Sequence, residues 1–216
     1  YFYAAELKRI LTATLARAMD RDPSFNPEMA YYSEGIWQAG TLEQLTRSKV
    51  ALKNAAISPE GRLSFAGDIT GRAEAWQETR AQCSEWPIYG TDWQVVEGLL
   101  QAQFHERLAI LRPAAVPVLL APSFHSKVTF DVQAQKHVWH LCDAAGRWLS
   151  LEFRQNDSTK RAAELLHLSV VQLVLAEARA VGSRFVMTPI SVVLQSPGNE
   201  GNELLNFEIA PYQRKK

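Results

Sequence analysis

The chain has 216 residues, of which 47% are hydrophobic and 21% are charged, as is usual for a folded globular protein. Its 23 lysines and arginines balance its 23 aspartates and glutamates, so the formal net charge is zero. This balance argues against a dedicated polyanion-binding protein, whose surface is usually strongly basic. The sequence contains no apolar run of the about 18 residues needed to cross a membrane, so we expect no membrane contact.

Cys83 and Cys142 are the only cysteines, and two distant thiols do not make a disulfide framework. They fit a reducing compartment, which predicts a cytoplasmic protein. The chain begins at Tyr1 rather than at a methionine and shows no signal peptide. We therefore expect it to be part of a larger protein.

The N-terminal part, residues 1–112, is predicted to be mainly helical. Apolar residues at steps of three and four indicate a first helix over residues 1–22, which Pro23 and Pro27 bring to an end. This apolar stripe consists of Leu7, Ile10, Leu11, Leu15 and Ala18. Residues 29–37 carry aromatic side chains around a glycine, which favours a strand.

Thr41 and Gln44 have the spacing of a capping box at the start of a helix. That helix is expected to continue to about residue 56, although residues 45–55 also fit a strand. Asp68 is placed to cap a further helix that reaches Cys83.

The clearest helical pattern covers residues 92–111, where Thr91 and Gln94 repeat the capping-box spacing. Its apolar stripe consists of Val96, Leu99, Leu100, Phe104, Leu108 and Leu111. After Pro113 the apolar period changes from 3.6 to about 2. This change predicts a domain boundary at Arg112–Pro113.

The C-terminal part, residues 113–216, is predicted to be mainly antiparallel β-structure. One hairpin turns at Asp143–Gly146 and a second near Val181–Gly182, with a short helix over Ser158–His167 between them. A last strand is expected from Leu204 onward. These patterns predict an α+β protein whose helical N-terminal part packs on a mostly antiparallel C-terminal β-sheet or small barrel.

Three residues have the chemistry of zinc ligands. His140 and Cys142 share a face of the predicted strand, and His125 on the preceding segment is placed to supply a third ligand. No second cysteine pair completes the site, so the favoured interpretation is a polar sheet residue beside a core cysteine. We therefore expect no metal.

Catalytic patterns are also missing from the sequence. It has no G-x-S-x-G nucleophile elbow and no phosphate-binding glycine loop. Cys83 lacks a nearby histidine to stabilise a thiolate, so burial is the favoured interpretation. We predict no catalytic residue, no cofactor-binding residue and no cofactor.

The densest internal basic stretch contains Arg47, Lys49 and Lys53. These side chains are able to contact phosphates of a nucleic acid, but in a neutral protein a solvated face is favoured. The chain also has six tryptophans. Trp139 and Trp148 flank the first hairpin and are predicted to be cross-strand neighbours, with core packing as the favoured role.

Four segments between Trp86 and Val193 carry a family resemblance: VPVLLAP, WHLCDAAGRWLSLEF, ELLHLS and LVLAEARAVGSRFVMTPISVV. This region, about half of the chain, resembles the part that follows the zinc finger in bacterial SWIM-type zinc-finger proteins. The finger's Cys-x-Cys and Cys-x-His pairs are absent here, so no zinc-binding residue carries over. The resemblance implies a non-catalytic accessory region of a bacterial, cytoplasmic protein.

The sequence thus favours a non-catalytic protein-interaction or scaffold module of a larger bacterial protein or complex. Its expected partner is another protein or another region of the same larger chain. One alternative is a hydrolase or transferase whose site assembles from scattered residues. A further alternative is a nucleic-acid-associated module that uses the face of Arg47, Lys49 and Lys53.

Overall fold

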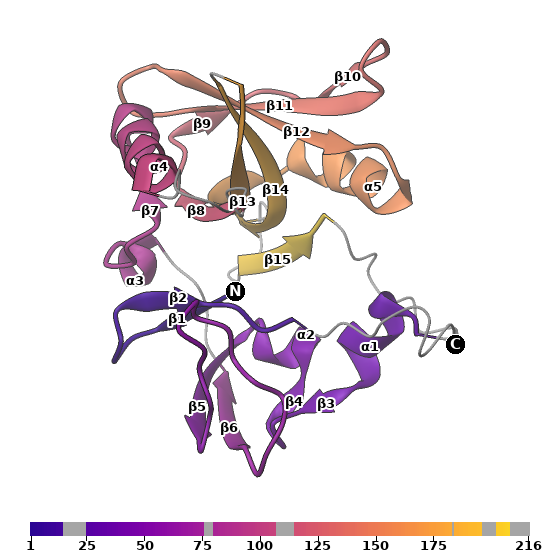
Figure 1. The fold of residues 1–216 in the computed structure, drawn as a ribbon. Helices are drawn as coiled ribbons and strands as arrows, with labels where there is room; N and C mark the ends of the chain where they lie inside the picture. Colours follow the sequence, from indigo (N-terminus) through magenta and orange to yellow (C-terminus); the bar gives the residue numbers. More distant parts are fainter. Residues whose placement is uncertain (15–24, 76–79, 107–114, 183, 196–201, 208–216) are drawn as a thin grey trace, which may run out of the picture. The chain divides into compact units, whose positions relative to one another are not determined.

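The computed structural model describes residues 1–14, 25–75, 80–106, 115–182, 184–195 and 202–207. Across these residues it contains fifteen strands and only five helices, and most of the strands belong to one large mixed sheet (Figure 1). The predicted fold class, a helical N-terminal part packed on a C-terminal sheet, is therefore wrong. The N-terminal residues form short strand pairs rather than a helical layer.

The chain divides into two compact units, Tyr1–Glu78 with Tyr212–Lys216, and Thr79–Pro211. The boundary predicted at Arg112–Pro113 lies outside the described residues. The helix predicted over residues 92–111 belongs to the second unit, together with the large sheet. Each unit has its own hydrophobic cluster.

The first unit is built from three two-stranded sheets and two short helices. Its elements in chain order are β1 (Phe2–Ala4), β2 (Arg9–Leu11), α1 (Pro27–Ser33), β3 (Gly35–Ile36), β4 (Gly40–Thr41), α2 (Leu42–Leu45), β5 (Ser48–Lys53) and β6 (Thr70–Ala75). Trp37 is buried in their core and stacks on Phe65 with ring centroids 5.4 Å apart. The indole N–H of Trp37 donates to the carbonyl of Ser64 at 3.0 Å, which satisfies its one polar atom.

Two predictions fail at the start of this unit. The first helix is replaced by the β1–β2 hairpin, whose turn places Lys8 at a φ of 49°; residues 15–24 lie outside the described part. The strand predicted over residues 29–37 is mostly the helix α1. Asn26 caps α1 by accepting from the amides of Glu28 and Met29, and Pro27 occupies its first turn. Pro27 therefore begins a helix, because its missing N–H is not needed there.

The capping box of Thr41 and Gln44 is confirmed, with both reciprocal hydrogen bonds formed. Its helix α2 has only four residues, and the chain continues as strand β5, which was the alternative interpretation. The helix predicted from Asp68 to Cys83 is wrong in its first part, because Thr70–Ala75 pairs with β5. Residues 76–79 lie outside the described part, and Arg80–Cys83 is helical. Alternating burial along β5 shows that only one face of this ribbon packs on the core.

The second unit contains the large sheet and three helices. Its elements are α3 (Arg80–Cys83), β7 (Tyr89–Gly90), α4 (Trp93–Glu106), β8 (Val116–Leu120), β9 (Phe124–His125), β10 (Thr129–Asp131), β11 (Lys136–Cys142), β12 (Trp148–Arg154), α5 (Asp157–Leu166), β13 (Val170–Val181), β14 (Arg184–Gln195) and β15 (Asn202–Asn206). The strand order is β10-β11-β12-β14-β13-β8-β7, with β9 beside β11 and β15 beside β14. The β7–β8 and β12–β14 pairs are parallel, so the sheet is mixed.

The hairpins predicted in this unit are confirmed. The β11–β12 hairpin turns through Asp143 to Gly146, and Gly146 has a φ of 81° that favours glycine. The β13–β14 hairpin turns at Gly182, which has a φ of 63°. The helix predicted over Ser158–His167 is α5. The last strand is β15, which begins two residues before Leu204.

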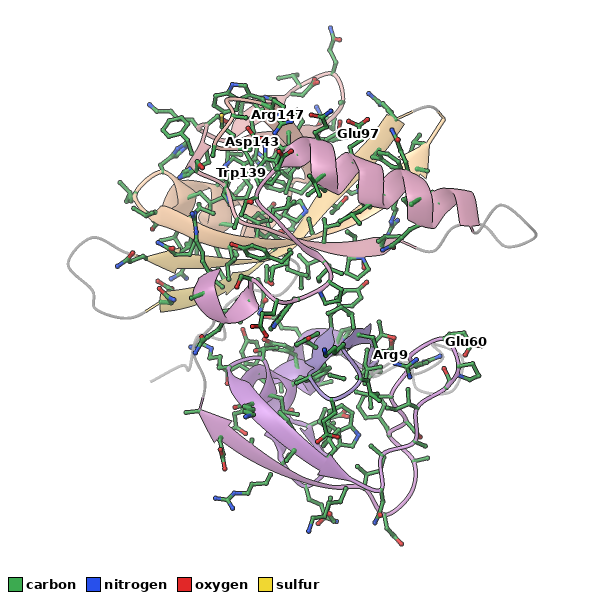
Figure 2. All side chains as sticks on the ribbon, turned by 90° about the vertical axis from the view of Figure 1, so that its left-hand side faces the viewer. Arg9, Glu60, Glu97, Trp139, Asp143 and Arg147 are labelled. Carbon is green, nitrogen blue, oxygen red and sulfur yellow. The ribbon has the colours of Figure 1, made fainter. Side chains whose placement is uncertain are left out.

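The core of the second unit lies between the sheet, α4 and α5. Helix α4 contributes a buried stripe at steps of three and four, made by Trp93, Val96, Leu100 and Phe104. Leu99, which the pattern assigned to this stripe, is 44% exposed. Leu108 and Leu111 lie outside the described residues. Trp139 of β11 is the largest of the fully buried side chains (Figure 2).

Candidate functional site

The side chains of β9, β11 and β12 form one open sheet face, which we call the outer face. Cys142 of β11 is paired with Phe124 of β9 on one side and with Trp148 of β12 on the other. Side chains directly opposite each other in neighbouring strands point to the same side of a sheet. Alternate residues of β11 therefore share this face with Cys142, whereas Trp139 and Leu141 point into the core.

Phe124 and Trp148 form an exposed aromatic pair at one end of the outer face. Phe124 is 63% exposed and Trp148 is 55% exposed, although both are large apolar residues. Their rings meet edge to face with centroids 6.1 Å apart. This contact gives each exposed ring a fixed neighbour and so limits the conformational freedom that binding would remove.

The remainder of the outer face is polar and of mixed charge. Nδ1 of His140 lies 2.8 Å from the hydroxyl of Ser150, its partner on β12. At the far end of the strands, Lys136 is paired with both Asp131 and Arg154 in register. The ammonium of Lys136 also contacts the carboxylate of Glu152 at 2.7 Å. Two basic and two acidic side chains thus share this end of the face.

Asp143, in the turn between β11 and β12, fixes the hairpin to the start of α4 (Figure 2). Its carboxylate accepts hydrogen bonds from the backbone amides of Trp93, Ala145 and Arg147, all within 3.0 Å. The guanidinium of Arg147 adds an ion pair of 2.9 Å. The indole N–H of Trp93 donates to the carbonyl of Leu141 in the same region. Because Trp148 follows Arg147 directly, this network sets the position of the exposed ring.

Arg147 also joins α4 through Asp92. The guanidinium contacts the Asp92 carboxylate at 2.6 Å and the Gln94 side chain at 2.8 Å. Asp92 accepts from the amides of Gln94 and Val95, so Asp92, rather than the predicted Thr91, caps the helix. The hydrogen bond from Arg147 is the main reason that the pKa of Asp92 lies below its ordinary value.

The pKa of Asp143 is set by opposing effects. Burial favours the protonated acid, but the amides of Trp93 and Arg147 and the guanidinium of Arg147 together hold the pKa below its ordinary value. The same two carboxylates raise the pKa of Arg147, with the hydrogen bond to Asp92 as the largest cause. Asp143 is therefore an ionised anchor of the turn.

His137 of β11 lies on the core side of the sheet, between the rings of Phe130 and Phe153 at centroid distances of 5.2 Å. It is 9% exposed, and its Nε2 atom has no hydrogen-bond partner among the described residues. Burial, followed by the positive charge of Lys160, lowers the pKa of this imidazole below 6.5. A hydrogen bond to the backbone of Thr129 acts in the opposite direction.

We expect this protein to lose stability as the pH falls from about 7 to about 5, because unfolded histidine, with a pKa of about 6.5, takes up a proton that buried His137 resists. The His137→Phe variant should lose this part of the pH dependence. It should also gain about 1 kcal/mol of unfolding free energy at the lower pH, since no unpaired nitrogen is buried. Urea unfolding at both pH values measures the difference.

His137→Gln is the matched control for that experiment, because it removes the titration but keeps buried polar atoms. It should flatten the pH dependence and yet be less stable than the wild type at both pH values. An unchanged slope in both variants would show that His137 does not resist protonation.

The three candidate zinc ligands are not brought together. His140 and Cys142 lie on the outer face, as predicted, but His125 is paired with Leu141 and therefore points to the opposite side. The His125 ring packs on Trp139, at a centroid distance of 5.8 Å. Among the described residues, no group of three or more histidines, cysteines or acids is arranged to hold a metal ion.

Both cysteines are buried and unbridged. Cys83 is fully buried at the end of α3, which confirms the interpretation of Cys83 as a buried residue. Cys142 is 9% exposed, and its thiol donates to the carbonyl of Asp143 at 3.5 Å. Its thiol therefore lies beneath the exposed rings of its two neighbours and serves packing.

The predicted basic face lies in the first unit. Lys49 and Lys53 project from the exposed side of β5, whereas Arg47 precedes the strand and contacts Glu43 of α2 at 3.4 Å. Glu74 of β6 is paired in register with Lys49. Carboxylates therefore accompany two of the three predicted cations, which weakens the local positive field.

Sequence reasoning missed the exposed aromatic pair. Trp148 was expected to be a cross-strand neighbour of Trp139, but Trp139 is paired with Leu151 and the two indoles point to opposite sides of the sheet. The length of the turn sets this register. It pairs Cys142 with Trp148, which leaves Trp139 opposite Leu151. Phe124 gave no signal, because its pairing with Cys142 joins segments that are distant in sequence.

Comparisons with protein-family models, curated proteins and solved structures found no match to this chain. No helix within the described ranges is long and apolar enough to cross a membrane. The functional assignment therefore depends on the residues and their geometry.

Proposed function

We propose that this chain is a non-catalytic protein-interaction module, a scaffold part of a larger bacterial protein or complex. The observation that supports this proposal is the exposed pair of Phe124 and Trp148 on the outer face. The proposed occupant of the outer face is a segment of a separate partner protein.

The aromatic pair has the features of an interface anchor. Tryptophan is enriched among the few residues that carry most of the binding energy in protein complexes. Each ring here exposes more than half of its surface while held against the other. Covering both rings would remove a large apolar area from water without first ordering flexible side chains.

The charges around the pair favour a protein partner over a nucleic acid. The far end of the outer face carries Lys136 and Arg154 but also Glu152 and Asp131. A protein surface can supply complementary charges of both signs to such a face, whereas an extended nucleic-acid backbone supplies negative charge only. His140 and Ser150 between the two ends offer polar contacts for the rim of an interface.

The resemblance to the region that follows the zinc finger of bacterial SWIM-type proteins supports the bacterial part of the proposal. Two buried cysteines that form no disulfide support a cytoplasmic location, where thiols remain reduced.

The proposal predicts that Phe124→Ser with Trp148→Ser abolishes partner binding. Proteins captured by the wild-type chain from the native extract are identified, and the candidate partner is purified for direct titration. Loss of each anchor should raise the dissociation constant about 30-fold, the effect of about 2 kcal/mol at a binding hot spot. Isothermal titration calorimetry with the purified partner measures this change.

Val181→Ser is the matched control, because Val181 is also 52% exposed but lies at the tip of the β13–β14 hairpin. It should bind as tightly as the wild type. Equal binding by the aromatic double variant would exclude the outer face as the interface. Turnover of a small molecule by the chain alone would favour the hydrolase or transferase alternative. Nucleic-acid binding that is lost on replacing Lys49 and Lys53 would favour the nucleic-acid-associated module.

A further inference from the structure

A polar hollow of about 690 Å³ lies at the end of β11 and β12 opposite to the aromatic pair. It is lined by residues of the β10–β11 turn and of the segment that leads from β12 into α5. Figure 1 shows where these two segments run. Among the described residues, those that line the hollow are Ala134, Gln135, Lys136, Arg154, Gln155, Asn156 and Lys160. Three of these carry a positive charge and none carries a negative charge.

The β10–β11 side of the hollow is held in one conformation. The Asp131 carboxylate accepts from the amides of Gln133 and Ala134 at 2.9 and 3.0 Å, which fixes the turn. Gln135 adopts a φ of 53° and donates through its side chain to the carbonyl of Val132. The Asp131 carboxylate thus accepts hydrogen bonds within the turn. Asp131 is not one of the residues that line the hollow.

The α5 side is held by a capping box. The Asn156 side chain accepts from the amide of Thr159, and the Thr159 hydroxyl accepts from the amide of Asn156, both at 2.8 Å. The same hydroxyl lies 3.0 Å from the carbonyl of Arg154. The backbone from Arg154 to Asn156 is therefore fixed. Since the amides of Asn156 and Thr159 are already engaged, recognition of a ligand falls to the side chains.

The three cations differ in how they are paired. Lys136 contacts Glu152, which lies outside the hollow. In the part of the chain that the structure describes, no carboxylate forms an ion pair with Arg154 or Lys160. Like charges gathered around one concavity repel each other, and an anion placed between them removes that repulsion.

We propose that this hollow binds the phosphate group of a small phosphorylated molecule, with Arg154 and Lys160 as its principal ligands and Lys136 as a third. A guanidinium donates two parallel hydrogen bonds to phosphate, and an ammonium supplies a point charge. Gln135 and Gln155 add neutral side chains that are able to hydrogen-bond phosphate or hydroxyl oxygens.

The lining also limits the class of ligand. The volume is in the range of sites for small molecules. No aromatic side chain is among the described lining residues, so these residues offer no stacking platform for a nucleic-acid base. Recognition therefore rests on the phosphate, and a single-stranded nucleic acid is the disfavoured ligand.

His137 offers an internal reporter of occupancy. The charge of Lys160 contributes to lowering the pKa of the His137 imidazole, together with its burial. An anion bound beside Lys160 offsets that charge, so the pKa of His137 should rise on binding. Lys160→Gln should raise it in the absence of ligand.

The test uses the whole chain and inorganic pyrophosphate as the probe, at constant ionic strength maintained with chloride. Pyrophosphate binding is measured by calorimetry and by the NMR titration of His137. Arg154→Gln and Lys160→Gln should each weaken binding about tenfold, the value of one charged hydrogen bond. Lys127→Gln, a change of an exposed lysine outside the lining, should leave binding unchanged.

The expected result is saturable pyrophosphate binding that both lining variants weaken and that shifts the His137 titration upward. Binding that Lys127→Gln weakens equally would reveal only nonspecific charge attraction and would overturn the proposal. The absence of binding, or binding of a short single-stranded oligonucleotide without binding of pyrophosphate, would also overturn it. None of these results depends on the aromatic end of the outer face.

Discussion

Replacing Trp139 with alanine is expected to cost about 3–5 kcal/mol of unfolding free energy, the range measured for buried aromatic truncations. Trp139 is 0% exposed. Its indole packs beside Phe207 and His125, at centroid distances of 6.3 and 5.8 Å. Truncation removes this apolar contact and leaves a cavity that the rigid sheet cannot close. Urea unfolding followed by far-UV circular dichroism measures the loss without relying on tryptophan fluorescence.

Trp148→Ala is the matched control, since it removes the same side chain from the neighbouring strand. Trp148 is 55% exposed, so its loss should change the unfolding free energy by no more than about 0.5 kcal/mol. Similar losses in the two variants would mean that Trp148 is not on an open face. That result would also remove the basis for the proposed interaction surface.

Asp143→Ala is expected to lower the unfolding midpoint by on the order of 10 °C. The carboxylate holds the amides of Trp93, Ala145 and Arg147 as well as the Arg147 guanidinium. Removing it leaves these donors without their acceptor and detaches the start of α4 from the β11–β12 turn. Asp143→Asn should also destabilise the protein. The side-chain NH2 of asparagine is a hydrogen-bond donor, and it would face turn groups that are themselves donors.

The pH dependence should distinguish this anchor from an ordinary surface acid. The folded pKa of Asp143 lies below its ordinary value, so its stabilising contribution is complete above the unfolded pKa of about 3.9. The contribution is lost as the pH falls from there through the folded pKa. The wild type should therefore lose more stability on acidification than Asp143→Asn, as measured by thermal unfolding across this range.

Asp131→Asn is the control, because Asp131 also caps a turn through two amides but lies at an exposed position. Its midpoint should fall by much less than that of the Asp143 variants. If the two positions proved equally sensitive, the link between the hairpin and α4 would not be the source of the effect.

Local signals in the sequence were sufficient to predict the helix α4 and the two hairpins of the second unit. The spacing of Val96, Leu100 and Phe104 identified α4, because a helix buries one stripe whatever it packs against. The turn residues at Asp143–Gly146 and at Gly182 identified both hairpins, since glycine there meets a backbone requirement that is local.

The first unit shows why such signals fail elsewhere. The stripe from Leu7 to Leu11 fits a helix, yet this segment is paired as the β1–β2 hairpin. Trp37 adopts a φ of 52° in the β3–β4 turn, a conformation that asparagine or glycine would adopt more readily. Burial of its ring against Phe65 and Phe2 compensates for that backbone conformation. Contacts between distant segments decided these elements.

The sequence by itself determined the long helix α4, the two C-terminal hairpins and the placement of His140 and Cys142 on one strand face, because each depends on residues close together in the chain. Only the tertiary structure decided that His125 points away from these residues, that Phe124 joins Trp148, and that Arg154 and Lys160 border one hollow. The physical reason is that strand pairing and register join segments through long-range hydrogen bonds and burial, which no local period encodes.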